Sequence, residues 1–146
     1  METLRDSLDS VGYLTNLAGR LLVRALERRM PGGSAGPMPV FLALSDGKAL
    51  PQKELARLAA VEQPTMANTL ARMQRDGLVR GAPDPADGRS TLLSLTPLGR
   101  QRADAALSAA GEVNALALTG FEPDERTRFL AMLRRMIATL EADSGP

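Results

Sequence analysis

The chain has 146 residues, of which 44% are hydrophobic and 24% charged, so it can bury a core in one domain or in a small domain with dimerisation helices. Cysteine and histidine are both absent, which excludes disulfides, thiolate or imidazole metal sites and nucleophile–histidine catalysis; we therefore expect no enzyme, no metal and no cofactor. The formal net charge is +1, no apolar run is long enough to cross a bilayer, and the N-terminus does not resemble a signal peptide, so we expect a cytoplasmic protein with no membrane partner.

The first predicted element is a long helix over residues 3–29. Apolar residues from Leu4 to Ala25 recur at steps of three and four, the spacing of one helix face. The glycines and prolines of PGGSAGPMP, residues 31–39, then end the helix. A short second helix is predicted from Val40 to about Asp46.

Two more helices are predicted between Pro51 and Gly77. The third helix begins at Pro51, and its expected buried stripe is Leu55, Leu58 and Ala59. A tight turn over residues 60–62 separates it from a fourth helix over residues 63–76. On a helical wheel the fourth helix has a core face and a polar face. The core face is Met66, Leu70 and Met73, and the polar face is Pro64, Thr65, Asn68, Arg72 and Arg75.

A β-hairpin is predicted next, from β-prone runs at residues 78–80 and 91–95 that flank a loop rich in Pro, Asp and Gly. Arg89 lies near the tip, where a guanidinium could enter a narrow minor groove of DNA. Asp87 could orient that guanidinium by a charge-assisted hydrogen bond. The alternative is a solvated loop with an incidental Asp-Gly-Arg turn.

Two long helices are predicted to complete the chain. Thr96 and Pro97 have the residue types of an N-cap and a first helical residue, and the helix they begin runs to about Leu118. After a break at Gly120, the last helix begins at Pro123. Its apolar face is Phe129, Leu133, Met136, Ile137 and Leu140.

Charge is unevenly distributed along the chain. Residues 48–100 hold eight basic and five acidic residues, whereas the segment after residue 100 holds five basic and seven acidic residues. A basic middle segment is typical of a module that binds phosphate, although a chance asymmetry of a solvated surface is an equally good interpretation of charge alone.

The motifs together resemble the MarR family of winged-helix transcription regulators. QKELARLAAVEQPTMANTLARMQRDGLV is similar to the family's helix-turn-helix, and PDPADGRSTLLSLTPLGR to its wing and the start of the next helix. The resemblance implies a mostly α fold with a small β-hairpin wing. It implies a DNA-binding lobe over residues 38–96 and a helical region, residues 1–30 and 97–146, that intertwines in a homodimer. An intramolecular core is the alternative for the apolar stripes of that region.

The resemblance also implies a repressor that binds a pseudo-palindromic operator in double-stranded DNA. The DNA-contacting residues it implies are Gln63, Pro64, Thr65, Asn68, Thr69, Arg72, Arg75, Arg80, Asp87 and Arg89. Two positions depart from the family pattern. Glu62, a poor N-cap, stands where Ser is common, and Gly81 stands where Arg is common, with Arg80 as the expected substitute.

Members of the family commonly respond to small anionic or phenolic ligands. Here the candidate pocket residues for an aromatic or lipophilic ligand are Tyr13, Arg20, Met38 and Phe41; the alternative is that they are ordinary core or surface residues. The competing function is a winged-helix protein-interaction module with weak or no DNA binding. Glu62, Gly81 and the low net charge favour that alternative.

Overall fold

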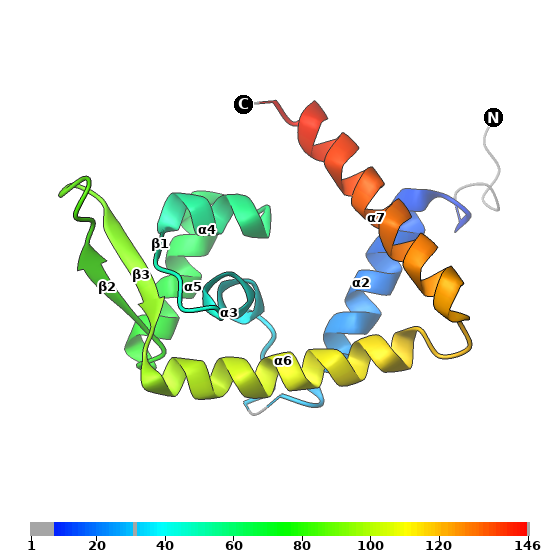
Figure 1. The fold of residues 1–146 in the computed structure, drawn as a ribbon, viewed down its shortest axis with the longest axis horizontal. Helices are drawn as coiled ribbons and strands as arrows, with labels where there is room; N and C mark the ends of the chain where they lie inside the picture. The colour runs from blue at the N-terminus through cyan, green and yellow to red at the C-terminus, as the bar shows by residue number, and fades with distance from the viewer. Residues whose placement is uncertain (1–7, 31, 146) are drawn as a thin grey trace. The chain divides into compact units, whose positions relative to one another are not determined.

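The computed structural model describes residues 8–30 and 32–145, and these are mostly helical with one small antiparallel sheet (Figure 1). This confirms the predicted fold class. The elements in chain order are α2 (Val11–Glu27), α3 (Met38–Leu44), β1 (Leu50–Pro51), α4 (Gln52–Ala59), α5 (Gln63–Arg75), β2 (Val79–Pro83), β3 (Thr91–Leu95), α6 (Pro97–Ala117) and α7 (Pro123–Asp143). The chain forms two compact units, residues 1–113 and 114–146.

The predicted uninterrupted helix over residues 3–29 is wrong at Ser10. This residue has an extended backbone, with φ −72° and ψ 143°, and its hydroxyl accepts a hydrogen bond of 3.1 Å from the backbone amide of Tyr13. A serine that caps the amides of the following turn starts a new helix, even where the apolar spacing continues through it. Residues 3–7 lie outside the described residues. At its other end α2 stops at Glu27, two residues earlier than predicted.

The turn between α4 and α5 is made by Ala60, which has the left-handed backbone φ 52° and ψ 43°. The core face of α4 consists of Leu55 and Ala56, whereas Leu58, which we expected to be buried, is 51% exposed. The short, tightly packed helix buries the small Ala56 against its neighbours, and this turns Leu58 towards solvent. Gly77, with φ 74°, follows the end of α5 as predicted.

The sheet has the strand order β1-β3-β2, with every pair antiparallel. In the hairpin, Val79 pairs with Leu95 and Gly81 with Leu93; Leu50 of β1 also pairs with Leu93, from the other side of β3. Sequence analysis did not predict β1, because two residues are too few to show an alternating pattern. The third strand fixes the base of the wing against the start of α4.

One close contact joins the recognition lobe to α6. The amide of Leu78 donates to the carbonyl of Met73 at the end of α5 (2.8 Å), and the carbonyl of Leu78 accepts from the amide of Thr96 (3.0 Å). The hydroxyl of Thr96 then caps α6 by accepting from the amide of Gly99 (3.0 Å). A Cβ atom at Gly99 would lie 1.9 Å from the Leu78 carbonyl oxygen, so only glycine fits there.

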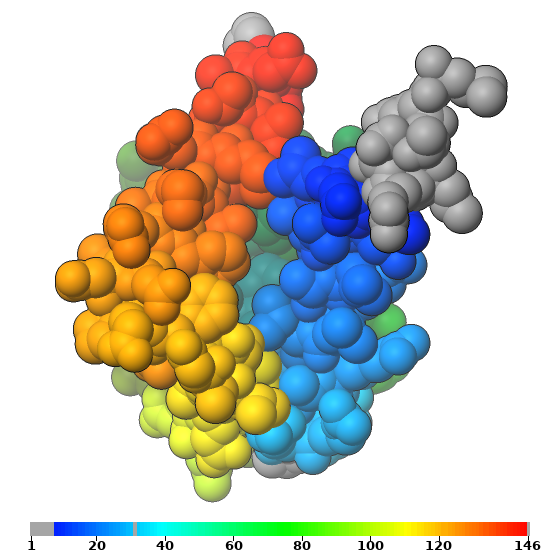
Figure 2. Space-filling view, turned by 90° about the vertical axis from the view of Figure 1, so that its right-hand side faces the viewer, coloured from blue at the N-terminus to red at the C-terminus, as the bar shows by residue number. Residues whose placement is uncertain are grey.

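The lobe and the long helices differ in burial. The apolar side chains of α3 and α5 pack into one core with residues of α4, β2, β3 and the first turns of α6. By contrast, α7 has no buried residue, and α2 buries only Ala25 and Leu26 near its end. Large apolar side chains reach the surface on both helices, from Val11 (62% exposed) on α2 to Leu140 (58% exposed) on α7. Figure 2 shows each of these helices exposed along much of its length.

Candidate nucleic-acid interface

The two faces of α5 are as the sequence predicted. Met66, Leu70 and Met73 are buried in the core of the lobe. The outer side of the helix carries exposed residues, all of them predicted to contact DNA: Gln63, Pro64, Thr65, Asn68, Arg72 and Arg75. Thr69 differs, because it is half-buried and its hydroxyl donates to the carbonyl of Thr65 (3.2 Å). Small polar groups thus lie near the N-terminus of α5, and arginines lie further along it.

The N-terminus of α5 has no side-chain cap. Glu62 occupies the N-cap position with an extended backbone, and its carboxylate forms no capping hydrogen bond. Pro64 lacks an amide hydrogen, so the first-turn amides of Gln63 and Thr65 are the donors left without a side-chain acceptor. A helix start of this kind attracts anions, but the nearby charge of Glu62 opposes that attraction.

The tip of the wing is held by a series of local hydrogen bonds. The Asp84 carboxylate accepts from the amide of Ala86 (2.8 Å), and the Asp87 carboxylate accepts from the amide of Arg89 (3.1 Å). The amides of Asp84 and Ser90 donate to the carbonyls of Ser90 and Asp87, respectively. Two Asx turns therefore fix the backbone on both sides of the tip.

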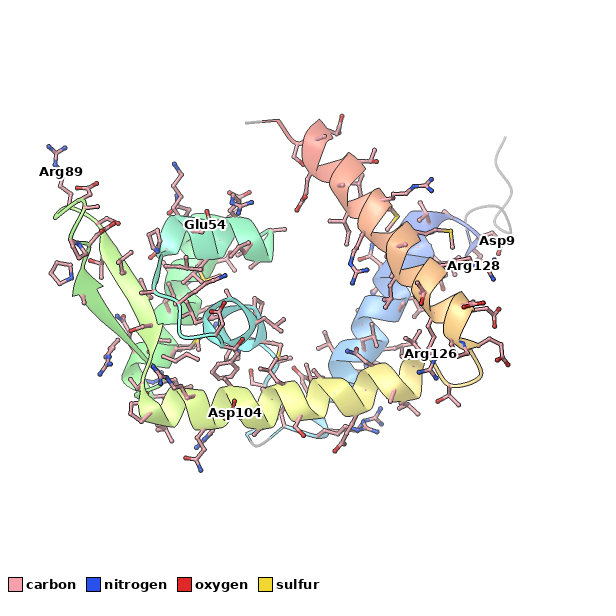
Figure 3. The ribbon with its side chains drawn as sticks, viewed as in Figure 1. Asp9, Glu54, Arg89, Asp104, Arg126 and Arg128 are labelled. Carbon is pink, nitrogen blue, oxygen red and sulfur yellow. The ribbon has the colours of Figure 1, made fainter. Side chains whose placement is uncertain are left out.

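Arg89 projects from this tip, away from the hairpin (Figure 3). We expected Asp87 to orient its guanidinium, but Asp87 instead bonds the Arg89 backbone amide. The aspartate therefore positions the backbone that carries the arginine, and the guanidinium forms no ion pair within the described part of the chain. An exposed, unpaired cation at the end of a fixed hairpin can reach a DNA backbone or groove.

Gly81 also has a structural explanation. A Cβ atom at this position would lie 2.7 Å from Cγ2 of Thr91 on the neighbouring strand. An arginine there is incompatible with Thr91 unless the threonine side chain moves. Arg80 is exposed on the opposite face of the strand, because successive side chains alternate, so it does not occupy the place that a side chain at Gly81 would take.

The cations of the interface differ in their availability. Arg75 is bound to Asp76, with 3.2 Å between Nε and Oδ1, and Arg57 is paired with Glu54. The hydrogen bond from Arg57 lowers the pKa of the Glu54 carboxyl group. Arg72 and Arg80, like Arg89, have no ion pair among residues 8–30 and 32–145. Of the predicted DNA-contacting arginines, Arg75 alone has its charge partly offset.

Sequence analysis missed a groove between α5 and the wing. Its lining residues are Pro51, Gln52, Lys53, Ala67, Leu70, Gln74, Ser90, Thr91 and Leu93. The exposed Lys53 and the two glutamines bring polar groups to the same side as the predicted reading face. Lys53 was one of the basic residues counted in the middle segment, but its position beside the wing depends on the pairing of β1 with β3, which the sequence does not show.

The four residues predicted to line a ligand pocket are not brought together in one cavity. Met38 and Phe41 belong to the core of the lobe. Tyr13 is 42% exposed on α2, and Arg20, whose Nε donates to the carbonyl of Asn16 (3.4 Å), lines a shallow hollow made by α2 alone. Phe41 does line a separate hollow, beside the loop that follows α2.

Two searches of the described residues found no further sites. No group of three or more acidic, histidine or cysteine side chains is placed to hold a metal ion. None of the helices in the described ranges is long and apolar enough to cross a membrane.

Comparison with known proteins gives consistent matches. The sequence model of the MarR family matches residues 37–90, which extend from α3 to the tip of the wing. The HTH-type transcriptional repressor NicR of Pseudomonas putida is 30% identical over 140 residues, and the alignment covers 89% of this chain and 89% of that protein.

Solved structures extend the similarity to nearly the whole chain. A MarR-family transcriptional regulator from Silicibacter pomeroyi is 32% identical, with a TM-score of 0.79 over 95% of this chain and 96% of that one. BpsR of Bordetella bronchiseptica, whose DNA binding is regulated by 6-hydroxynicotinic acid, is 27% identical, with a TM-score of 0.79 over 88% of this chain and 94% of that one. The proteins matched are regulators of transcription, not enzymes.

Proposed function

The chain belongs to the MarR family of transcriptional regulators, and we propose that it is a homodimeric repressor that reads its operator with α5 and the wing. The observation that carries the proposal is the pairing of two features in one lobe. The outer face of α5 is polar and exposed, and two of its neighbouring cations, Arg72 and Arg89, are unpaired within the described residues. A recognition helix needs such a face to approach base edges.

Each part of the lobe has a role in this proposal. Thr65 and Asn68, near the N-terminus of α5, contact base edges in the major groove. Arg72, further along the helix, contacts a phosphate or a guanine. Arg89 enters the adjacent minor groove, and Asp87 supports it through the backbone of the wing tip.

The exposed apolar surface of the terminal helices supports a homodimer. Leu14, Leu21 and Val23 of α2 and Met132 and Ile137 of α7 are all more than a third exposed. Soluble monomers rarely leave so many large apolar side chains in contact with water. A two-fold dimer would bury these faces and present two α5 helices to half-sites about 34 Å apart, one turn of DNA.

Regulation by a small aromatic or lipophilic ligand completes the proposal. It is supported by the similarity to BpsR, whose DNA binding is regulated by 6-hydroxynicotinic acid, and the repressor role is supported by the similarity to NicR. We propose an aromatic carboxylic acid as the ligand class. Its binding would favour a spacing of the two α5 helices that does not match the half-sites.

A direct test is a fluorescence-anisotropy titration of the purified chain with DNA that flanks its own coding sequence. We expect specific binding that weakens steeply between 50 and 200 mM salt, on the order of a thousandfold for six phosphate contacts. Arg89→Ala is expected to weaken binding by about tenfold or more. The matched control is Arg128→Ala, which removes an exposed arginine of α7 outside the lobe. Equal losses in the two variants would contradict the minor-groove role of Arg89.

The second candidate is a winged-helix module that binds a protein partner. The uncapped Glu62 carboxylate at the start of α5 and the missing side chain at Gly81 favour it, because both weaken attraction to phosphate. The same titration separates the two functions. Absence of binding to any DNA at 50 mM salt would favour the protein-interaction module.

A further inference from the structure

A small hollow lies where the lobe meets the first turns of α6. Its lining comes from four places in the chain: Met30, Gly32, Ser34 and Pro37 after α2, Phe41 of α3, Asp76 and Leu78 after α5, and Arg102 of α6. Its volume of about 170 Å³ suits a single-ring molecule, because drug-sized ligands occupy about 300–1,000 Å³. All of these residues belong to the unit formed by residues 1–113.

The chemistry of the hollow is divided between floor and rim. Phe41, which is 3% exposed, and Leu78 are buried apolar residues, and Met30 packs against the same core. The rim carries the exposed Arg102 and Asp76. Asp76 is paired with Arg75, whereas Arg102 has no ion pair in the described residues, so the unpaired charge at the rim is positive.

This arrangement specifies a ligand class. A flat aromatic ring fits an apolar floor, and a carboxylate on it can form a bidentate pair with the Arg102 guanidinium. A hydrogen-bond donor on the ring can meet the Asp76 carboxylate, which accepts when ionised. A ring with a carboxylate and a donor therefore matches both charged groups of the rim.

The position of the hollow connects it to the recognition helix. Asp76 is the C-cap of α5, and Leu78 bonds the last turn of α5 on one side and Thr96, the cap of α6, on the other. The loop on the remaining side is anchored by the Glu27 carboxylate, which accepts from the amide of Ala35 (3.3 Å). Figure 1 shows this loop running alongside α6. A molecule in the hollow contacts the end of α5, the start of α6 and the loop at once.

We propose that this hollow is a regulatory site for a single-ring aromatic carboxylate, with Arg102 as the anchor of the carboxylate and Asp76 as the acceptor from the ring donor. The proposal rests on the proposed function and gives it a location. A bound acid holds the end of α5 against α6 in one arrangement. If that arrangement disfavours the operator-bound position of α5, the acid weakens DNA binding by its difference in affinity for the two arrangements.

The absence of cysteine from the chain allows a test that does not depend on DNA binding. Ser34→Cys places the chain's single thiol at the rim, and its alkylation rate by iodoacetamide is measured with and without 6-hydroxynicotinic acid. This probe carries both a carboxylate and a donor. At ten times its Kd, an acid that covers the thiol is expected to slow alkylation by about elevenfold. Ser108→Cys, on an exposed position of α6 that does not line the hollow, should alkylate at an unchanged rate.

Three comparisons test the chemical assignment. Arg102→Gln in the Ser34→Cys background is expected to abolish protection, whereas Arg100→Gln, two residues away and outside the hollow, should retain it. The amide of the probe should protect neither variant, because it lacks the anion. Nicotinic acid, which lacks the donor, is expected to bind on the order of tenfold more weakly.

The outcomes separate this site from the proposed function. Absence of protection, protection that survives Arg102→Gln, or equal protection at Ser108→Cys would overturn the regulatory site. In each case, operator binding in the anisotropy titration would leave the DNA-binding function standing. Protection without any DNA binding would instead contradict the proposed function and leave the ligand site.

Discussion

The DNA-binding lobe and the two long helices α2 and α7 use their apolar residues differently. The lobe places its apolar residues in one core of α3, α4, α5 and the sheet, with polar side chains outside. The helices instead expose theirs, and α7 buries none of its residues. The difference indicates that the lobe carries its own packing, whereas the helices depend on a second chain to cover them.

The largest expected effect is on the contact that joins the lobe to α6. Gly99→Ala places a methyl group where the Leu78 carbonyl oxygen lies, 1.9 Å away, and backbone must move to accept it. We expect a loss of about 3 kcal/mol or more in the free energy of unfolding, measured by urea denaturation. Gly111→Ala in the same helix meets open space and should stabilise by about 0.5–1 kcal/mol. Equal effects in the two variants would contradict the close contact.

The dimer is expected to be the next most sensitive feature. Ile137→Glu places a charge on a half-exposed apolar position of α7, and burial of an unpaired charge in a dimer interface is costly. We expect the dimer dissociation constant to rise by about 30-fold or more, measured by sedimentation equilibrium. Thr127→Glu, an exposed polar position of the same helix, is the control. A wild-type monomer at micromolar concentration would remove the basis for this prediction.

The wing tip should show a smaller effect that separates backbone support from direct contact. Asp87→Ala removes the acceptor of the Arg89 amide but leaves the guanidinium in place. The loss of one such hydrogen bond corresponds to about 0.5–1.5 kcal/mol, or roughly a three- to tenfold weaker DNA affinity. Anisotropy titrations of Asp87→Ala and Arg89→Ala on one DNA fragment compare the two. A larger loss for Asp87→Ala would mean that the aspartate acts in some way other than by supporting the arginine.

The smallest effect is expected at Leu58. This side chain is half exposed, so Leu58→Ala should change the free energy of unfolding by less than about 1 kcal/mol. Leu55→Ala, at a buried position on the same helix, should cost about 2–5 kcal/mol. Thermal or urea unfolding of the pair measures both. Similar costs would show that Leu58 is covered in the assembled protein.

Sequence patterns predicted the parts of the molecule that depend on local spacing. The buried Met66, Leu70 and Met73, the end of α5 before Gly77 and the hairpin after it all follow from helical periodicity and turn residues. Ser10 was missed because a single side-chain cap outweighed continuous apolar spacing. A start signal of this type is visible in a sequence when Ser is weighed against helix propensity.

The remaining differences depend on contacts between distant residues. The approach of Gly99 to the Leu78 carbonyl and of Thr91 to Gly81 joins positions that only the folded chain brings together. The bond from the Arg89 amide to Asp87 required a specific backbone turn and not only the spacing of the two residues. The candidate ligand residues failed for the same reason, because helical periodicity gives no information on which separate elements share a cavity.

The central claim is that α5 and the wing bind DNA through their unpaired arginines, and the dependence of affinity on salt tests it most directly. The logarithm of the association constant is measured against the logarithm of salt concentration for the wild type and for Arg72→Ala. We expect a steep negative slope for the wild type, and a slope smaller in magnitude by about one for the variant, as one phosphate contact is lost. A flat wild-type slope, or an unchanged slope in Arg72→Ala, would contradict the claim.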